Sequence, residues 1–310
     1  MRPPSRQALA SLFVLGSLAV GGTGCSGSST GAGSGEADNR TGLQNALASV
    51  PESAAAETVS YADVAVIRDL IAKDSEQFGG LGNYGIPELA TYSDETPRQE
   101  WGFDEKTVAT SVVVGASNSR LTGEFDTATI AKALERKGYR ASDTDGGTLL
   151  KKTGDETTYQ VSDSVRVARH DSDGAGLGFG EPERSVAGDP AYAAVDECLG
   201  NVYYASFYGK REKKDVVLLA IGARLGADGS STETLCTVNS SEAAAQSAAT
   251  KLREKTKDGE PYAGAKVTVR NGETHIVSMT WRNSSEPRLR PRDNDKTNIL
   301  PGLLLLTGRS

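Results

Sequence analysis

The sequence predicts an α+β protein built from two similar modules, each an antiparallel sheet with a helix packed on one face. Three observations lead to this prediction. Short segments rich in valine, leucine and threonine alternate with turn residues, a helical segment follows the second strand in each half, and a hairpin follows each helix. A single α+β domain in which this order recurs by coincidence is the alternative.

The first 24 residues have the composition of a secretory signal peptide. Arg2 and Arg6 form a short cationic start, and Ala8 to Val20 are thirteen mostly apolar residues. This run is shorter than the about 20 apolar residues that a membrane-spanning helix needs. We therefore expect the segment 1–24 to be removed from the mature chain.

A cysteine follows the leader directly. The small residues Thr23 and Gly24 precede Cys25, and Gly22 stands where a leucine or valine is commoner. This arrangement resembles a bacterial lipobox, which implies that the Cys25 thiol carries a diacylglycerol. Acyl chains contribute about 0.8 kcal/mol per buried CH₂. The resemblance thus places the protein at the outer face of the bacterial cytoplasmic membrane, held there by its lipid; secretion without lipid is the alternative.

Residues 25–56 are predicted to form a flexible, lipid-anchored tether. They are rich in serine, glycine and alanine. Such a composition buries too little apolar surface to offset the entropy of ordering the chain.

The first module is predicted over residues 57–170. Residues 109–116 and 120–125 favour strands, and Asp126 is placed to cap a helix in which Ile130 and Leu134 lie four residues apart. Gly138 then ends the helix, and extended segments resume at 139–141 and 148–151.

The second module is predicted over residues 191–310, after a glycine-rich connecting loop at 171–190. Strands are expected at 215–224 and 233–238. Asn239, with Glu242 three residues later, has the spacing of a capping box. The segment 266–281 predicts a hairpin with Asn271-Gly272 as a two-residue turn, which would place His275 opposite Thr268.

Two cysteines, Cys198 and Cys236, lie beyond Cys25. An even pair in an exported protein predicts a disulfide. Cys198 lies in an expected helix over 191–199 and Cys236 in an expected strand, so the bond would attach the helix to its sheet. A metal site is the alternative, but two cysteines with no histidine nearby supply too few soft ligands.

Two groups of short motifs resemble extracytoplasmic lipoproteins of high-GC Gram-positive (actinobacterial) bacteria. These are Glu124-Phe125-Asp126 with Gly138-Tyr139, and Asp196 to Gly200 with Leu235-Cys236. The resemblance extends over most of the body. It supports the envelope location and the pairing of the cysteines, and it implies no particular activity.

Composition and missing motifs argue against several function classes. Removing the leader changes the formal net charge from −7 to −9, because the leader carries two arginines and no acid. An acidic surface disfavours nucleic acid. The sequence contains no H-E-x-x-H, S-x-x-K or P-loop motif. We therefore predict no nucleic-acid partner, no cofactor and no metal site.

Several local features are possible sites with a more ordinary structural reading. His170 and His275 are more typical of a loop and a half-buried strand than of a catalytic base. Asp171, Asp173 and Gly176 match a calcium loop in part. The remaining features are the carboxylates Glu181 and Glu183, the basic residues 210–214, the arginines 282, 288, 290 and 292, and the apolar tail 299–306, which either packs on the body or docks a partner.

The sequence therefore predicts a cell-envelope lipoprotein that binds or scaffolds an envelope protein or wall polymer without catalysis. The alternative is a hydrolase acting on cell-wall material through paired carboxylates.

Overall fold

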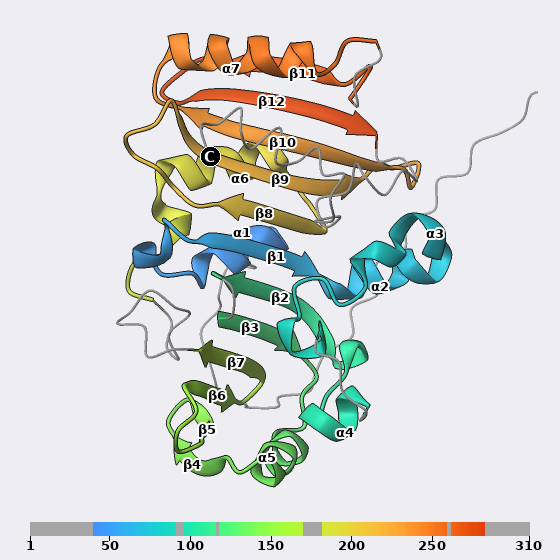
Figure 1. Ribbon diagram of the computed structural model, residues 1–310, viewed down its shortest axis with the longest axis vertical. Helices are drawn as coiled ribbons and strands as arrows, with labels where there is room; N and C mark the ends of the chain where they lie inside the picture. The colour runs from blue at the N-terminus through green and yellow to red at the C-terminus, as the bar shows by residue number, and fades with distance from the viewer. Residues whose placement is uncertain (1–39, 91–95, 116–117, 170–181, 259–261, 283–310) are drawn as a thin grey trace, which may run out of the picture. The chain divides into compact units, whose positions relative to one another are not determined.

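The described residues form one antiparallel sheet of twelve strands, with helices on both faces (Figure 1). The computed structural model describes residues 40–90, 96–115, 118–169, 182–258 and 262–282. The strand order across the sheet is β11-β12-β10-β9-β8-β1-β2-β3-β7-β6-β5-β4. The strands are β1 (Thr58–Asp63), β2 (Val108–Val114), β3 (Asn118–Gly123), β4 (Arg140–Thr144), β5 (Gly147–Lys151), β6 (Thr157–Val161), β7 (Ser164–Arg169), β8 (Tyr204–Tyr208), β9 (Val216–Leu225), β10 (Ser231–Asn239), β11 (Lys266–Arg270) and β12 (His275–Arg282).

Seven α-helices and five short 3₁₀ turns accompany these strands in the described ranges. The helices are α1 (Gly42–Ala48), α2 (Val64–Lys73), α3 (Ser75–Phe78), α4 (Pro97–Trp101), α5 (Thr127–Arg136), α6 (Pro190–Leu199) and α7 (Glu242–Glu254). The 3₁₀ turns are η1 (Glu52–Ala54), η2 (Gly79–Leu81), η3 (Pro87–Ala90), η4 (Glu105–Thr107) and η5 (Val186–Gly188).

Alternating side chains along the strands build a core on each face of the sheet. Helices α1 and α6 cover one face, where their apolar residues pack on β1, β2, β8, β9 and β10. On the opposite face, α2 and α5 pack on the strands from β1 to β7, and α7 packs on β9, β10 and β12. The central strands are therefore buried from both sides, which explains their near-continuous apolar sequence.

Both halves of the sheet follow one order of connection. In the first half β1, β2 and β3 are neighbours, α5 follows, and the chain returns so that β7 pairs with β3. In the second half β8, β9 and β10 are neighbours, α7 follows, and β12 pairs with β10. The α+β class is thus confirmed. Because β1 also pairs with β8, the strands form one continuous sheet in place of the two separate sheets we expected.

The predicted tether is wrong for residues 40–56, which belong to the folded body. The core on this face of the sheet includes four buried residues from this segment, Leu43, Ala46, Leu47 and Val50. Their spacing of three, four and seven residues is that of one helix face. The high alanine and serine content masks this pattern. Residues 25–39 lie outside the described residues.

The described part of the predicted connecting loop, residues 182–189, packs against the folded body. Val186 is fully buried, and Ser185 forms a β-bridge with Pro51. The Glu52 N–H donates to the Arg184 carbonyl at 3.0 Å. These contacts fix the segment against the chain just after α1, and α6 begins at Pro190. Residues 171–181 lie outside the described residues.

The sequence predicted the N-cap of α5 correctly but not that of α7. Asp126 caps α5 by accepting from the Thr129 N–H, and Ile130 and Leu134 are buried, as expected. Helix α7, however, is capped by Ser241. Asn239 instead ends β10, where its amide donates to the His275 carbonyl.

The predicted two-residue turn between β11 and β12 is wrong. Residues 271–274 separate the strands, and Thr268 pairs with Ser278, whereas His275 pairs with Asn239. The observed register places Val267 and Val269 beside Met279 and Val277, so all four side chains lie on the face covered by α7. Burial of this apolar set, and not the turn sequence, determines the register.

Candidate functional site

Two cavities flank helix α1 on the face of the sheet that α1 and α6 cover. We call them the strand cavity, between α1 and strands β2 and β3, and the helix cavity, between α1, η5 and α6. Their volumes are about 440 and 410 Å³. Both fall within the range of sites that hold small molecules, about 300–1,000 Å³.

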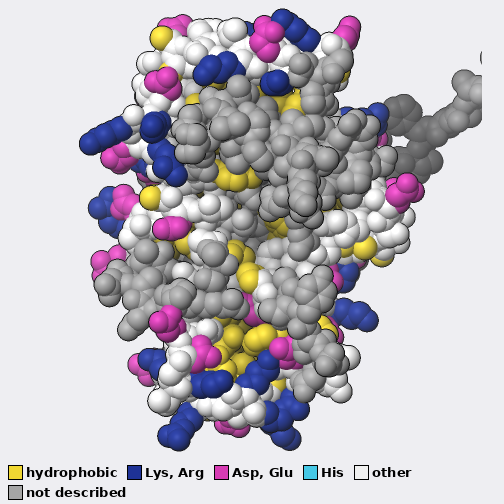
Figure 2. Space-filling model, viewed as in Figure 1, with side chains coloured by type: hydrophobic (Ala, Val, Ile, Leu, Met, Phe, Trp, Pro, Cys, Tyr) yellow, Lys and Arg dark blue, Asp and Glu magenta, His cyan; other side chains and the backbone are white. Residues whose placement is uncertain are grey.

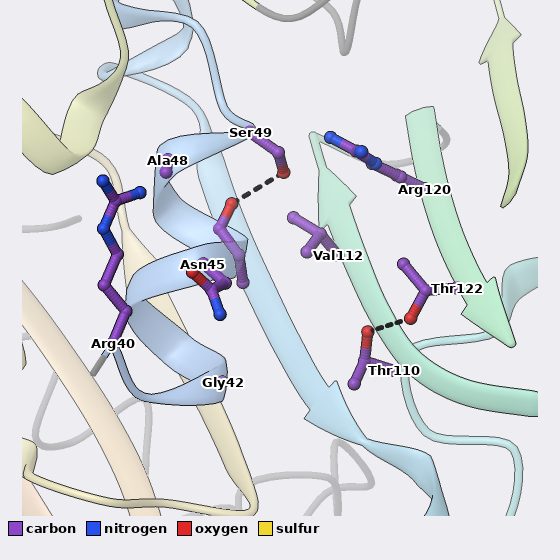
Figure 3. A pocket seen from close by; sticks show the side chains of 10 residues that line it. Arg40, Gly42, Asn45, Ala48, Ser49, Thr110, Val112, Arg120 and Thr122 are labelled. Carbon is purple, nitrogen blue, oxygen red and sulfur yellow. Dashed lines mark hydrogen bonds between the residues drawn. The ribbon is translucent and has the colours of Figure 1, made fainter. Parts of the chain in front are cut away.

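The strand cavity combines a polar strand surface with the side of a short helix (Figure 3). Alternation places Thr110 and Val112 of β2 and Arg120 and Thr122 of β3 on the face toward α1. The two threonine hydroxyls are 2.6 Å apart and hydrogen-bonded to each other. The other lining residues are Arg40, Gly42, Asn45, Ala46, Ala48 and Ser49.

The charge of the strand cavity is positive. None of the ten described residues that line it is acidic, and Arg40 and Arg120 are both among them. In Figure 3 the Arg40 guanidinium lies on the side of α1 away from the two threonines, so Arg120 is the cation beside them. Arg120 is directly opposite Arg166 of β7 in the register of the sheet. Like charges at directly opposed positions repel, and an anion held near them would reduce that repulsion.

The helix cavity has a buried carboxylate in its wall. Asp196 of α6 is only 8% exposed. Its Oδ2 accepts a hydrogen bond from Gln44 Nε2 of α1 at 2.7 Å, and its Oδ1 is buried without a hydrogen-bond partner. Burial raises the pKa of Asp196; the Gln44 hydrogen bond opposes this shift, and the neighbouring Glu197 charge adds to it.

Gln44 also stabilises the start of α1. Its Oε1 accepts from the Thr41 N–H at 3.0 Å, while Thr41 Oγ1 accepts from the Gln44 N–H at 3.2 Å. This reciprocal capping box satisfies two amide groups at the helix start. The same side chain therefore caps α1 and connects α1 to Asp196 of α6.

The predicted cysteine pair is joined in the structure. Cys198 at the end of α6 and Cys236 in β10 form a disulfide, with their Cα atoms 6.3 Å apart. Cys236 is fully buried in the core that α6 covers. The bond therefore attaches the helix that carries Asp196 to the sheet beneath it.

Of the other candidates suggested by the sequence, those that the structure describes line neither cavity. His275 shares its strand face with Val277, Met279 and Trp281, and its Nδ1 is buried without a partner. Glu183 is exposed. Cys25, His170, Asp171, Asp173, Gly176, Glu181, the arginines 288, 290 and 292 and the tail 299–306 lie outside the described residues.

The basic run 210–214 has a structural role at its first residue. Lys210 Nζ lies 2.5 Å from Asp189 Oδ2, and this hydrogen bond raises the pKa of Lys210. Asp189 is the N-cap of α6, because its Oδ1 accepts from the Ala191 N–H.

On the face of the molecule shown in Figure 2, the described acidic and basic side chains are interspersed.

Two features are absent from the part of the chain that the structure describes. Within it, no three histidine, cysteine, aspartate or glutamate side chains gather as a metal site. No described helix has the length and apolar content needed to cross a bilayer.

Sequence reasoning did not identify Arg120, Gln44 or Asp196. Two patterns in the sequence point to Gln44 and Asp196. Thr41 and Gln44 have capping-box spacing, and Asp196 occupies the apolar face of α6 together with Tyr192 and Leu199. An acid on a buried helix face indicates a polar site, but its partner on α1 is 152 residues away in sequence.

Comparison with known proteins provides little further information. No family model matches the chain, and no curated protein matches it. A solved structure, crystal form I of TP0453, aligns with a TM-score of 0.41 at 10% identity, covering 80% of this chain and 96% of that one.

Proposed function

We propose that the protein is a cell-envelope lipoprotein whose folded body is a non-catalytic binding module for an anionic group. The proposed anchor rests on the leader, in which a cationic start and an apolar run precede Cys25. Two acyl chains on one residue hold a protein durably at a membrane surface. The folded body begins about 16 residues after Cys25, so a short tether separates it from the bilayer.

The observation that carries the binding proposal is the composition of the strand cavity. Arg120, the Asn45 amide and the two threonine hydroxyls are among the groups that line it, and none of its described residues is acidic. Guanidinium groups form paired, charge-assisted hydrogen bonds with phosphate and carboxylate oxygens. The cavity is therefore suited to a phosphate or carboxylate carried by a wall polymer or a small molecule.

The alternative of a wall hydrolase finds less support. Cleavage of a glycosidic bond ordinarily uses two carboxyl groups on opposite sides of the bond. Across the described lining of both cavities, Asp196 is the single carboxylate.

We also propose that the two halves of the sheet are related modules joined at β1 and β8. This rests on their shared order, in which a helix, three neighbouring strands, a second helix and returning antiparallel strands follow one another, and the last returning strand pairs with the third. The first half differs by the insertion of α2, α3 and α4 between its first two strands, and by its four returning strands, β4 to β7, where the second half has two.

Calorimetric titration of the mature chain with inorganic phosphate and with poly(glycerol phosphate) tests the binding proposal. We expect Arg120→Gln to weaken binding roughly tenfold or more, because a charge-assisted hydrogen bond contributes about 1.5–3 kcal/mol. Arg120→Lys should retain part of the affinity, and Arg253→Gln, an exposed arginine on α7, should retain all of it. Equal affinity of Arg120→Gln and wild type, or release of sugar ends from isolated cell wall, would contradict the proposal.

Metabolic labelling with a fatty-acid analogue tests the anchor. We expect label in the wild-type protein and none in Cys25→Ala. The absence of label from both proteins would show that the chain is not acylated.

A further inference from the structure

The helix cavity carries two opposite charges, which distinguishes it from the strand cavity. Asp196 lies in its α6 wall, and Arg40 lies at its α1 side. In Figure 3, Arg40 extends from the start of α1 on the side of that helix away from Thr110 and Thr122. Apart from Gln44, the remaining lining is small or apolar and includes Leu47 and Ala193.

The Asp196 carboxylate lacks part of its hydrogen bonding. Gln44 Nε2 satisfies Oδ2, whereas Oδ1 is buried and has no partner. A buried carboxylate is costly unless it is paired with a cation or fully hydrogen-bonded. The neighbouring charge that influences Asp196 is Glu197, which is itself acidic and forms an ion pair with Arg270. An ammonium group brought by a ligand to the edge of Asp196 that lines the cavity would supply the missing opposite charge.

Charge balance limits the class of ligand. Arg40 would repel a simple cation bound near Asp196, and Asp196 would repel a simple anion bound near Arg40. A molecule that carries both charges avoids each repulsion, because each of its groups then meets the opposite charge of the protein.

From this arrangement we infer that the helix cavity binds a small zwitterion of the α-amino-acid class. Its ammonium group contacts Asp196, and its carboxylate lies toward Arg40. Its side chain lies against the apolar lining formed by Leu47, Ala48 and Ala193. The volume of about 410 Å³ is sufficient for a molecule of this size.

Binding of matched ligands to the mature chain tests this inference. A panel of L-amino acids is compared by calorimetry with the corresponding amines, which lack the carboxylate, and the N-acetyl amino acids, which lack the ammonium charge. We expect at least one amino acid to bind, and both of its derivatives to bind roughly tenfold more weakly or worse, because each loses one charged hydrogen bond.

Two variants assign the charges. Asp196→Asn preserves the size of the side chain and an acceptor for Gln44, and it should lose binding of the amino acid while remaining folded. Arg40→Gln should weaken the amino acid but leave its amine unchanged or bound more tightly, because the repulsion is gone. Arg253→Gln is the matched control and should bind both ligands as wild type does.

Three outcomes would overturn the inference: no amino acid binds at millimolar concentration, the N-acetyl derivative binds as well as its parent, or folded Asp196→Asn binds as wild type does. Because Arg40 also lines the strand cavity, and that cavity is suited to carboxylates, the ligands are also measured on Arg120→Gln, which should lose binding in the strand cavity and keep binding in the helix cavity. Failure of one proposal is therefore distinguishable from failure of the other.

Discussion

The Asp196 side chain is held by a single hydrogen bond in a position shielded from water. Its pKa is raised, chiefly by burial, so the folded chain binds a proton more tightly than the unfolded chain between the unfolded and folded pKa values of this group. The free energy of unfolding should therefore fall as the pH rises through that window. Above the window, ionised Asp196 is a net cost to the fold.

Asp196→Asn should remove that cost. We expect the variant to have a higher urea midpoint than wild type at pH 7, and a flatter dependence of the midpoint on pH above about pH 4, the ordinary titration range of aspartate. Asp228→Asn is a control of opposite sign, because hydrogen bonds from Ser230 lower the pKa of Asp228. Equal midpoints for Asp196→Asn and wild type at pH 7 would show that the buried charge is compensated.

The sequence correctly predicted features in which one side chain acts on residues close to it in the chain. Asp126 caps the helix that follows it, and glycine ends that helix, because both effects depend on a few adjacent residues. The site residues could not be found in this way. Gln44 reaches Asp196, and Arg120 comes to lie beside α1, only after distant elements pack together.

At the scale of elements, helix α7 shows how adjacent polar residues compete for a cap position. Ser241 accepts from the Ala244 N–H at 3.2 Å, whereas Asn239 is buried in the last position of β10. Strand pairing continues to Asn239, so the helix starts two residues later than we expected.

Ser241→Ala should therefore destabilise the protein by about 1 kcal/mol, the typical cost of losing an N-cap side chain. Ser240→Ala is the matched control, since Ser240 is exposed and donates only through its backbone. Urea unfolding measures both variants. A larger loss for Ser240→Ala than for Ser241→Ala would contradict the assignment of the cap.

The disulfide between Cys198 of α6 and Cys236 of β10 also stabilises the fold at the scale of elements. It closes a loop with a sequence separation of 38, for which the chain-entropy model gives about 4 kcal/mol. Cys198→Ser should lower the free energy of unfolding by a few kcal/mol. Amide exchange should increase in α6, β9 and β10 more than in β2 and β3, because α6 contacts the former strands.

Mass spectrometry of the unreduced protein should first show a peptide linking Cys198 to Cys236. Rapid alkylation of both thiols in the native protein without reductant would show that the bond does not form. The exchange experiment then has a clear control, since the first half of the sheet lies outside the closed loop.

At the scale of the whole molecule, the two halves of the sheet share their cores. Helices α1 and α6 cover a single cluster that draws Val112 and Val114 from β2 and Leu218 and Ala220 from β9. The main cluster of the first half also includes Tyr204 from β8. The sequence predicted the order of elements in each half, but shared burial depends on the pairing of β1 with β8, which no local pattern encodes.

The two halves should therefore unfold together, and the two tryptophans of the chain can test this. Trp101 of α4 lies beside Tyr159 in the first half, and Trp281 of β12 packs against Tyr262 in the second. In the single-tryptophan variants Trp101→Phe and Trp281→Phe, fluorescence reports one half at a time, and circular dichroism reports the whole chain. Separating the halves would expose the common core, so within each variant we expect the fluorescence and dichroism midpoints in urea to coincide. Midpoints that differ between the two probes within one variant would instead show that each half is an independent cooperative unit joined only by the hydrogen bonds between β1 and β8.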